Sequence, residues 1–168
     1  TAPDGTRGVW FLSLDATRMP AVAAARAGYN LPYFWSRMSL TASEPPDGLG
    51  SHVGRTFTYT CNRRWPKPTP ARSYIQVSVG EAIRPRDLTE FDHYLTARWR
   101  LYSARLGGGL RYALAQHEPW PLHRAQLVDL DDDLFTSAGL PEPVGDPVCH
   151  WSPGVEVRIG PPQKLAAS

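Results

Sequence analysis

The sequence has few lysines, and this scarcity limits the chemistry that it can perform. Its 18 Lys and Arg residues include only two lysines, Lys67 and Lys164. A lysine that forms a Schiff base must be desolvated or lie beside another cation to be nucleophilic at neutral pH. Both lysines stand beside prolines in segments that we expect to be exposed loops. Imine chemistry is therefore not expected of this chain.

The chain also has few cysteines, no long apolar run and only a small net charge. The cysteines, Cys61 and Cys149, lie far apart and outside any CxxC pattern. We expect free, buried or half-buried thiols, although the spacing leaves a disulfide open. Arg26 interrupts the longest Ala/Val run, so no window reaches the roughly 20 apolar residues of a membrane span. With a net charge of +2 and no visible signal peptide, we expect a cytoplasmic protein that binds neither nucleic acid nor membranes.

A strand, a short alanine-rich helix and a second strand open the chain. Residues 9–14 are apolar on both alternating faces, which is typical of a strand buried from both sides. Asp15 or Thr17 is expected to cap a helix over 17–28, with Pro20 in its first turn and Gly28 as its C-terminal cap.

The second strand carries an arginine between aromatic and apolar residues. Tyr33, Trp35 and Arg37 project to one face of this strand, and the even-numbered residues project to the other. A mid-strand arginine must either reach water or pair with a buried group. We expect Arg37 to point inward beside Tyr33, where it forms either an anion site or an ion pair with Glu118 or Glu90.

Alternation and turn residues predict the remaining elements. Strands are expected over 52–61, 73–82, 99–105, 110–118, 122–130 and 155–159, with a loop over 63–72 and short helices near 87–97 and 132–139. A capping box from Asp87 to Glu90 is expected at the start of the second helix. The triple glycine at 107–109 lies between strands, which indicates a hairpin tip rather than a phosphate loop. Residues 1–168 are therefore expected to form a single strand-dominated α+β domain.

Polar and aromatic residues on the predicted strands form the candidate site. If the sheet closes into a barrel, one face of every strand lines an interior that holds side chains or one small ligand. The candidates for catalysis are Tyr33, Arg37, His117 and Glu118. The candidates for ligand binding are Trp35, Arg98, Tyr102, Trp120 and Arg124. His117 and His123 follow no metal-binding pattern, so neither a metal nor a cofactor is expected.

Segments along most of the chain resemble one family. The resemblance is carried by FLSLD, LPYFWSRM, LTARWRLYSAR, HEPWPLHRAQL, LFTSAGLP and HWSPGVEVRIG, between about residues 8 and 160. These segments resemble the YqjF-like bacterial proteins of the acetoacetate decarboxylase-like superfamily. The resemblance implies an antiparallel or mixed β-barrel with about three short helices. Family members carry a further region before FLSLD, so we expect an N-terminal segment to be missing ahead of Thr1.

The same resemblance argues against acetoacetate decarboxylation. Those enzymes form a Schiff base on the first of two adjacent lysines, and the corresponding positions hold Tyr33 and Phe34. One hypothesis is that the barrel interior binds or converts a small organic acid or keto compound. Arg37 would then orient the anion while Tyr33 or His117 transfers protons in lyase-like or acid/base chemistry. The alternative is a non-catalytic structural or interaction domain with a side-chain-filled barrel, acting as a monomer or as a homo-oligomer.

Overall fold

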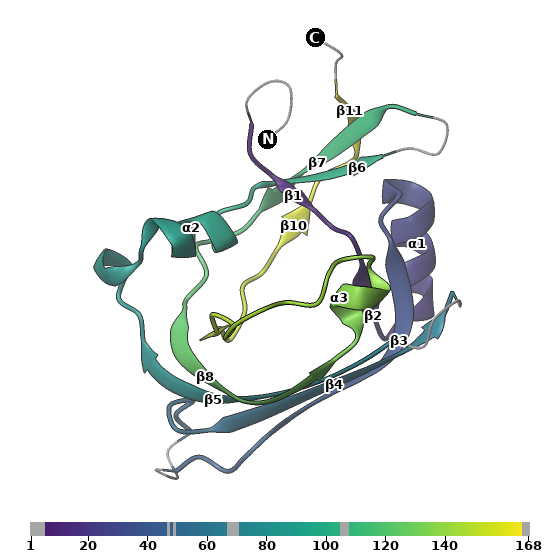
Figure 1. Cartoon of the computed structure of the whole chain (residues 1–168). Helices are drawn as coiled ribbons and strands as arrows, with labels where there is room; N and C mark the ends of the chain where they lie inside the picture. The colour runs from purple at the N-terminus through teal and green to yellow at the C-terminus, as the bar shows by residue number, and fades with distance from the viewer. Residues whose placement is uncertain (1–5, 47, 49, 67–70, 105–107, 166–168) are drawn as a thin grey trace.

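The computed structural model describes residues 6–46, 48, 50–66, 71–104 and 108–165. Strands predominate over helices, and the longest of them belong to one curled sheet that forms half of a barrel (Figure 1). The fold is therefore mixed α+β and strand-dominated, as the sequence predicts.

The larger sheet has six strands and forms the curved floor of Figure 1. Its order is β2–β3–β4–β5–β8–β9, and every pairing except β2–β3 is antiparallel. Register shifts interrupt the β3–β4 and β5–β8 pairs, and such bulges bend and twist a sheet. The strands are β2 (Leu14–Ala16), β3 (Tyr33–Ala42), β4 (Thr56–Trp65), β5 (Arg72–Ala82), β8 (His123–Asp132) and β9 (His150–Trp151).

The smaller sheet lies opposite this floor, at the top of Figure 1. β6 and β7 form the predicted hairpin, and Gly108 and Gly109 in its turn have positive φ, which glycine adopts readily. β1 pairs in parallel with β6, and the two C-terminal strands pair with β7. The strands are β1 (Val9–Trp10), β6 (Arg100–Ala104), β7 (Leu110–Gln116), β10 (Arg158–Ile159) and β11 (Gln163–Lys164).

The predicted strand over 9–14 is in fact split between the two sheets. β1 belongs to the smaller sheet and β2 to the larger one, so residues 11–13 form a link between them. Leu31, Leu101 and Ala113 form a buried cluster, against which Val9 and Leu14 pack. Phe11 packs against the same core, whereas Trp10 and Leu12 are about half exposed, so this segment is not buried from both sides as its sequence predicts.

Helix α1 (Met19–Tyr29) carries Pro20 in its first turn, as predicted, but its caps differ from the prediction. Arg18 occupies the N-cap without a side-chain hydrogen bond, and Asn30 ends the helix at a φ of 55°. Asparagine adopts this left-handed conformation more readily than most residues. In the described part of the chain, no helix is long and apolar enough to cross a membrane.

The second predicted helix consists of two pieces, a 3-10 turn (Pro85–Asp87) and helix α2 (Glu90–Thr96). Its capping box lies two residues later than predicted, because Thr89 and Asp92 cap each other reciprocally. Helix α3 (Leu134–Ser137) lies within the predicted range 132–139 and sits inside the curve of the larger sheet (Figure 1).

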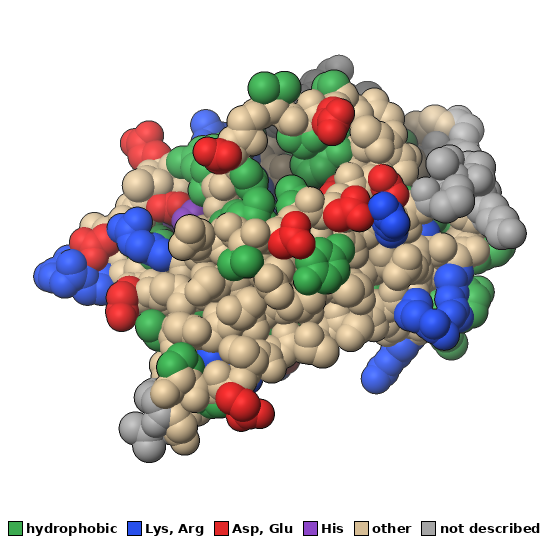
Figure 2. All heavy atoms as spheres, turned by 60° about the horizontal axis from the view of Figure 1, so that its bottom comes forward, with side chains coloured by type: hydrophobic (Ala, Val, Ile, Leu, Met, Phe, Trp, Pro, Cys, Tyr) green, Lys and Arg blue, Asp and Glu red, His purple; other side chains and the backbone are tan. Residues whose placement is uncertain are grey.

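The two faces of the larger sheet differ in polarity and burial. Ser36, Cys61 and Ser73 are buried, and the register places them on the inner face, the same face as Arg63, whose side chain donates to Ser137 of α3. The outer face carries rows of small polar side chains, and Gln76 Nε2 donates to Thr58 Oγ1 there at 3.1 Å. Figure 2 shows this outer face as a broad uncharged area with charged side chains gathered around its margins.

Candidate functional site

A buried ion pair joins β2 to β4 on the inner face of the larger sheet. Arg63 Nε donates to Asp15 Oδ1 at 2.9 Å, and Arg63 Nη2 donates to Asp15 Oδ2 at 2.8 Å. The two side chains are only 5% and 9% exposed. The fork of the guanidinium matches the two carboxylate oxygens, so the pair is bidentate.

Three serines complete the hydrogen bonding of this pair. Ser36 Oγ donates to Asp15 Oδ1 at 2.6 Å. Arg63 Nη2 also donates to Ser13 Oγ at 2.8 Å, and Arg63 Nη1 donates to Ser137 Oγ at 3.1 Å. Four of the five guanidinium N–H groups therefore have protein acceptors. Together these bonds fasten β2, β3, β4 and α3 to one another.

Asp15 stays charged at neutral pH although it is buried. Burial by itself would raise the pKa of Asp15. Hydrogen bonds from Arg63 and Ser36, together with the Arg63 charge, outweigh burial and hold the pKa of Asp15 below its usual value. The interior thus contains a true ion pair whose net charge is zero.

The arginine inside the sheet is Arg63, and the prediction that Arg37 points inward is wrong. In the β3–β4 ladder Ser36 lies opposite Arg63, whereas Arg37 lies opposite Asn62. Because consecutive residues of a strand point to opposite faces, Arg37 lies on the outer face, where its side chain is exposed. β4 also runs past its predicted end, which places Arg63 on a strand rather than in a loop.

The carboxylate partner also differs from the two that were expected. Glu90 and Glu118 are both exposed. The buried partner is Asp15, which the sequence analysis treats only as a candidate helix cap. Asp15 reaches Arg63 because β2 pairs in parallel with β3. Nothing in the sequence around Asp15 indicates this pairing.

A thiol and two hydroxyls lie near the pair on the inner face. Cys61 is a free cysteine and fully buried, and burial raises its pKa, so it remains a neutral thiol. Burial and the neighbouring Cys61 likewise raise the pKa of Tyr59. Ser73 lies opposite Cys61 in β5, and its buried hydroxyl has no hydrogen-bond partner among the residues that the structure describes. This interior offers neutral polar groups rather than an activated nucleophile.

An apolar groove opens beside the ion pair, between α3 and the link that joins β1 to β2. It has a volume of about 280 Å³. Trp10, Leu12 and Phe135 are 48%, 51% and 49% exposed, which is high for large apolar side chains that surround one groove. The main lining residues are Trp10, Leu12, Ser13, Leu134, Phe135 and Leu140.

Ser13 connects the groove to the ion pair and is the one polar residue of the lining. Its Oγ accepts a hydrogen bond from Arg63, which leaves its own O–H as a donor. Among the described residues no acceptor is found for that O–H. A ligand oxygen at this end of the groove would therefore meet a hydroxyl donor polarised by the guanidinium.

A second pocket of about 270 Å³ adjoins the groove and shares Trp10 and Leu12 with it. Tyr102, a predicted ligand-binding residue, lines this pocket. Its ring is buried, and its hydroxyl donates to Thr6 O at 3.4 Å.

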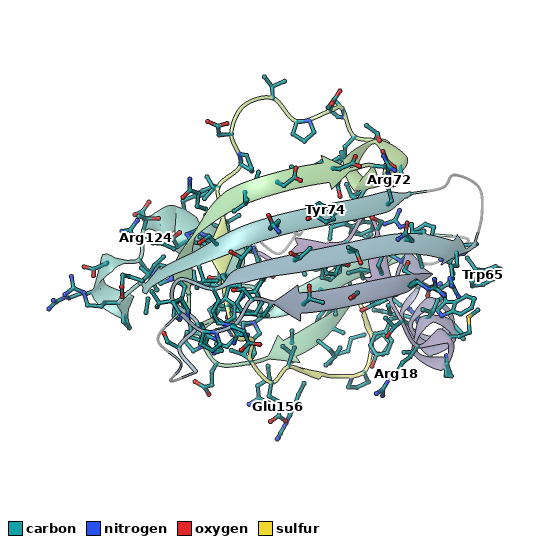
Figure 3. The ribbon with its side chains drawn as sticks, turned by 90° about the horizontal axis from the view of Figure 1, so that it is seen from below. Arg18, Trp65, Arg72, Tyr74, Arg124 and Glu156 are labelled. Atoms are coloured by element: carbon teal, nitrogen blue, oxygen red, sulfur yellow. The ribbon has the colours of Figure 1, made fainter. Side chains whose placement is uncertain are left out.

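The structure brings three other predicted site residues together at a different place. His117 Nε2 lies 3.2 Å from Arg98 O, and the ring centres of His117 and Trp120 are 6.0 Å apart. Arg124 is exposed, and Figure 3 shows it at the end of the larger sheet opposite Trp65. None of these residues lines the groove.

The remaining predicted residues of β3 have structural contacts. Tyr33 packs against the core cluster formed by Leu31 and its neighbours. Trp35 Nε1 donates to Thr17 O at 3.0 Å. The predicted catalytic set of Tyr33, Arg37, His117 and Glu118 is therefore not assembled at one point in the described structure.

A second polar pair, which sequence reasoning missed, joins β9 to α2. His150 Nε2 lies 3.1 Å from Asp92 Oδ1. Asp92 Oδ2 accepts from the backbone N–H and from the hydroxyl of Thr89, each at 2.7 Å. These bonds from Thr89 are the main cause that lowers the pKa of Asp92, and the His150 charge contributes less. The Thr-x-x-Asp spacing was the available sequence signal for this carboxylate.

The groove is shallow and open, and no acid or base among the described residues lines it. The side chains that line it are indole, phenyl, aliphatic and hydroxymethyl groups, none of which titrates near neutral pH. Lys164 is exposed on β11 of the smaller sheet, in a strand rather than the predicted loop, and Lys67 lies outside the described residues.

Comparison with known proteins places the chain in a family. The DUF2071 family, described as an uncharacterized conserved protein, matches residues 1–156. The chain is also 27% identical over 160 residues to the uncharacterized protein YqjF of Bacillus subtilis (strain 168), an alignment that covers 95% of this chain but 61% of that relative. No solved structure matches the chain significantly. Because the family match spans most of the chain, this protein belongs to the DUF2071 family.

Proposed function

We propose that this chain binds a small, largely apolar carbonyl or carboxylate compound in the groove between α3 and the β1–β2 link. The observation that supports this most directly is the arrangement of the lining, which is apolar except at Ser13. Ligand sites commonly combine such an apolar wall with a few placed polar groups. The volume of about 280 Å³ suits a small organic molecule.

The ligand oxygen would accept a hydrogen bond from Ser13, and the rest of the ligand would pack between Leu12 and Phe135. Arg63 is already neutralised by Asp15, so it offers little net attraction to an anion. A desolvated carboxylate costs more to bury than a neutral carbonyl when no free cation compensates it. We therefore favour a ketone or aldehyde over an acid of the same shape.

We also propose that the half-barrel is of the acetoacetate decarboxylase-like kind. The strand–helix–strand opening and the β6–β7 hairpin support this assignment. Schiff-base chemistry is not part of the proposal, because Tyr33 stands at the position of the first lysine in the resemblance and packs into the core. An experimental structure whose strand order differs from that superfamily would overturn this assignment.

A thermal-shift screen of small ketones, aldehydes and matched carboxylic acids tests the binding proposal. A ligand present at a hundred times its dissociation constant stabilises the folded state by about 2.7 kcal/mol. We expect ketones to raise the melting temperature more than the matched acids. Ser13→Ala and Phe135→Ala should abolish most of that shift, whereas Val144→Ala, a change at a fully exposed side chain, should leave it unchanged.

A second candidate is a non-catalytic structural or interaction domain. The observation in its favour is that most donors of Arg63 are already bound by protein groups. If no compound in the screen shifts the melting temperature of the wild-type chain, this second function replaces the first.

A further inference from the structure

The larger sheet has a long open edge along β3. β2 pairs with β3 only from Tyr33 to Trp35. From Arg37 to Ala42, no strand in the described part of the chain pairs with the side of β3 that faces away from β4. β3 is the outermost of the four long strands seen from below in Figure 3. Leu40, in the middle of this edge, is 66% exposed.

The register shows which backbone groups this edge leaves unpaired. Ser43 N donates to Thr56 O in β4 at 2.9 Å. In an antiparallel strand the N–H and C=O of one residue point to one neighbour, and those of the next residue point to the other. The odd-numbered residues therefore face β4, and Met38, Leu40 and Ala42 direct their N–H and C=O groups outward. Such a row of unpaired groups is a template for another strand.

We propose that this edge pairs with the same edge of a second copy of the chain. An antiparallel pairing about a twofold axis at Leu40 places Leu40 opposite Leu40 of the second copy. Met38 then lies opposite Ala42. The Leu40–Leu40 and Met38–Ala42 pairs are both hydrogen-bonded pairs, in which the opposite residues exchange backbone hydrogen bonds. Opposite residues share a face, so the inner apolar rows of the two sheets become continuous.

The side chains of the edge are compatible with this self-pairing. Arg37 would lie opposite Ser43 of the second copy, so the two arginines of the dimer do not oppose one another. Ser39 would lie opposite Thr41, and cross-strand hydroxyl pairs of this kind are favourable. The only charged residue between Arg37 and Ala42 is Arg37 itself, so little charge protects this edge from pairing.

The association is expected to be weak. An edge of six residues buries less surface than the roughly 1,200–2,000 Å² of a stable interface. The dimer should therefore appear as a reversible increase in mass with protein concentration in analytical ultracentrifugation. Leu40→Lys should remove the increase, whereas Leu130→Lys, on the same inner face but on β8 at the opposite side of the sheet, should leave it intact. Both leucines are about half exposed or more, and circular dichroism checks that both variants fold.

Disulfide trapping tests the register directly. In a Cys149→Ser background, Leu40→Cys places two thiols at a hydrogen-bonded pair, where Cα atoms lie about 5.5 Å apart, within disulfide range. We expect oxidation to give a covalent dimer with Leu40→Cys and none with Leu130→Cys. Trapping with Ser39→Cys instead of Leu40→Cys would overturn the proposed register. A chain that stays monomeric at every concentration, with no trapped dimer, would overturn the pairing itself.

Discussion

The Asp15–Arg63 ion pair and the Asp92–His150 polar pair lie toward opposite ends of the larger sheet, and their carboxylates are kept charged by different means. Asp15 depends on its partner, because burial raises its pKa and the hydrogen bonds and charge of Arg63, with Ser36, reverse that effect. Asp92 depends mainly on the N-cap bonds from Thr89, and His150 adds to them. Losing the partner should therefore matter far more at Asp15 than at Asp92.

The largest expected effect is that of Arg63→Ala. Removing one member of a buried pair leaves an uncompensated charge, which costs about 3–5 kcal/mol of unfolding free energy. Urea unfolding at neutral pH measures this loss. Arg72→Ala, which breaks an exposed pair with Asp131, is the matched control and should cost no more than about 1 kcal/mol. Equal losses for the two variants would contradict the structural role of Arg63.

The next effect is the pH dependence of stability. The folded pKa of Asp15 lies below the unfolded value of about 3.9, so its contribution is complete above about pH 4 and is lost as the pH falls through the folded pKa. Urea unfolding from about pH 6 down to about pH 2 should show this decline in the wild type. Asp15→Asn should be less stable at neutral pH and should show a weaker decline. An unchanged slope would mean that Asp15 is not the responsible group.

At the Asp92 pair the corresponding change is His150→Ala. Because Thr89 still bonds Asp92, this change should lower the melting temperature less than Arg63→Ala does. Thr89→Ala removes the hydroxyl bond to Asp92 Oδ2 and leaves the backbone N–H bond in place, and because the hydroxyl bond lowers the pKa of Asp92 more than the His150 charge does, this variant should raise that pKa more than His150→Ala does. NMR titration of the Asp92 carboxylate distinguishes the two. A larger rise of the Asp92 pKa with His150→Ala would mean that His150, and not Thr89, is the main cause of the lowered pKa.

The smallest expected effect is that of Arg37→Ala. The Arg37 side chain is exposed on the outer face and forms no ion pair with a carboxylate of the described residues, and surface changes of this kind usually lie within about 0.5 kcal/mol. The contrast with Arg63→Ala in the same unfolding assay tests which arginine lies inside the sheet. A loss of several kcal/mol from Arg37→Ala would contradict the register of β3 against β4.

Alternation in the sequence predicted most of the sheet but not its inner face. The strands near Tyr33, Thr56, Ser73 and His123 follow from alternating residues and from the turns between them. Both faces of β3 carry aromatic and polar side chains. The two-residue alternation of a strand therefore does not show whether Ser36 or Arg37 points inward. Arg63 was not predicted as an inner residue. The prolines that follow it indicated a loop from residue 63, whereas β4 continues to Trp65.

The candidate site was less predictable because it is assembled by pairing between distant segments. Ser13 and Asp15 meet Arg63 only through the parallel β2–β3 pair and its antiparallel neighbour β4. Phe135 reaches the groove because α3 lies inside the curve of the sheet. No local pattern in the sequence encodes these contacts, whereas the Thr89–Asp92 capping box does have a local signal.

Binding in the groove is tested most directly by a crystal structure of the chain with the compound that gives the largest thermal shift. We expect electron density for the ligand between Leu12 and Phe135, with its carbonyl oxygen within hydrogen-bond distance of Ser13 Oγ and the Asp15–Arg63 pair intact. Density at any other place in the molecule, with the groove beside α3 filled by water alone, would contradict it.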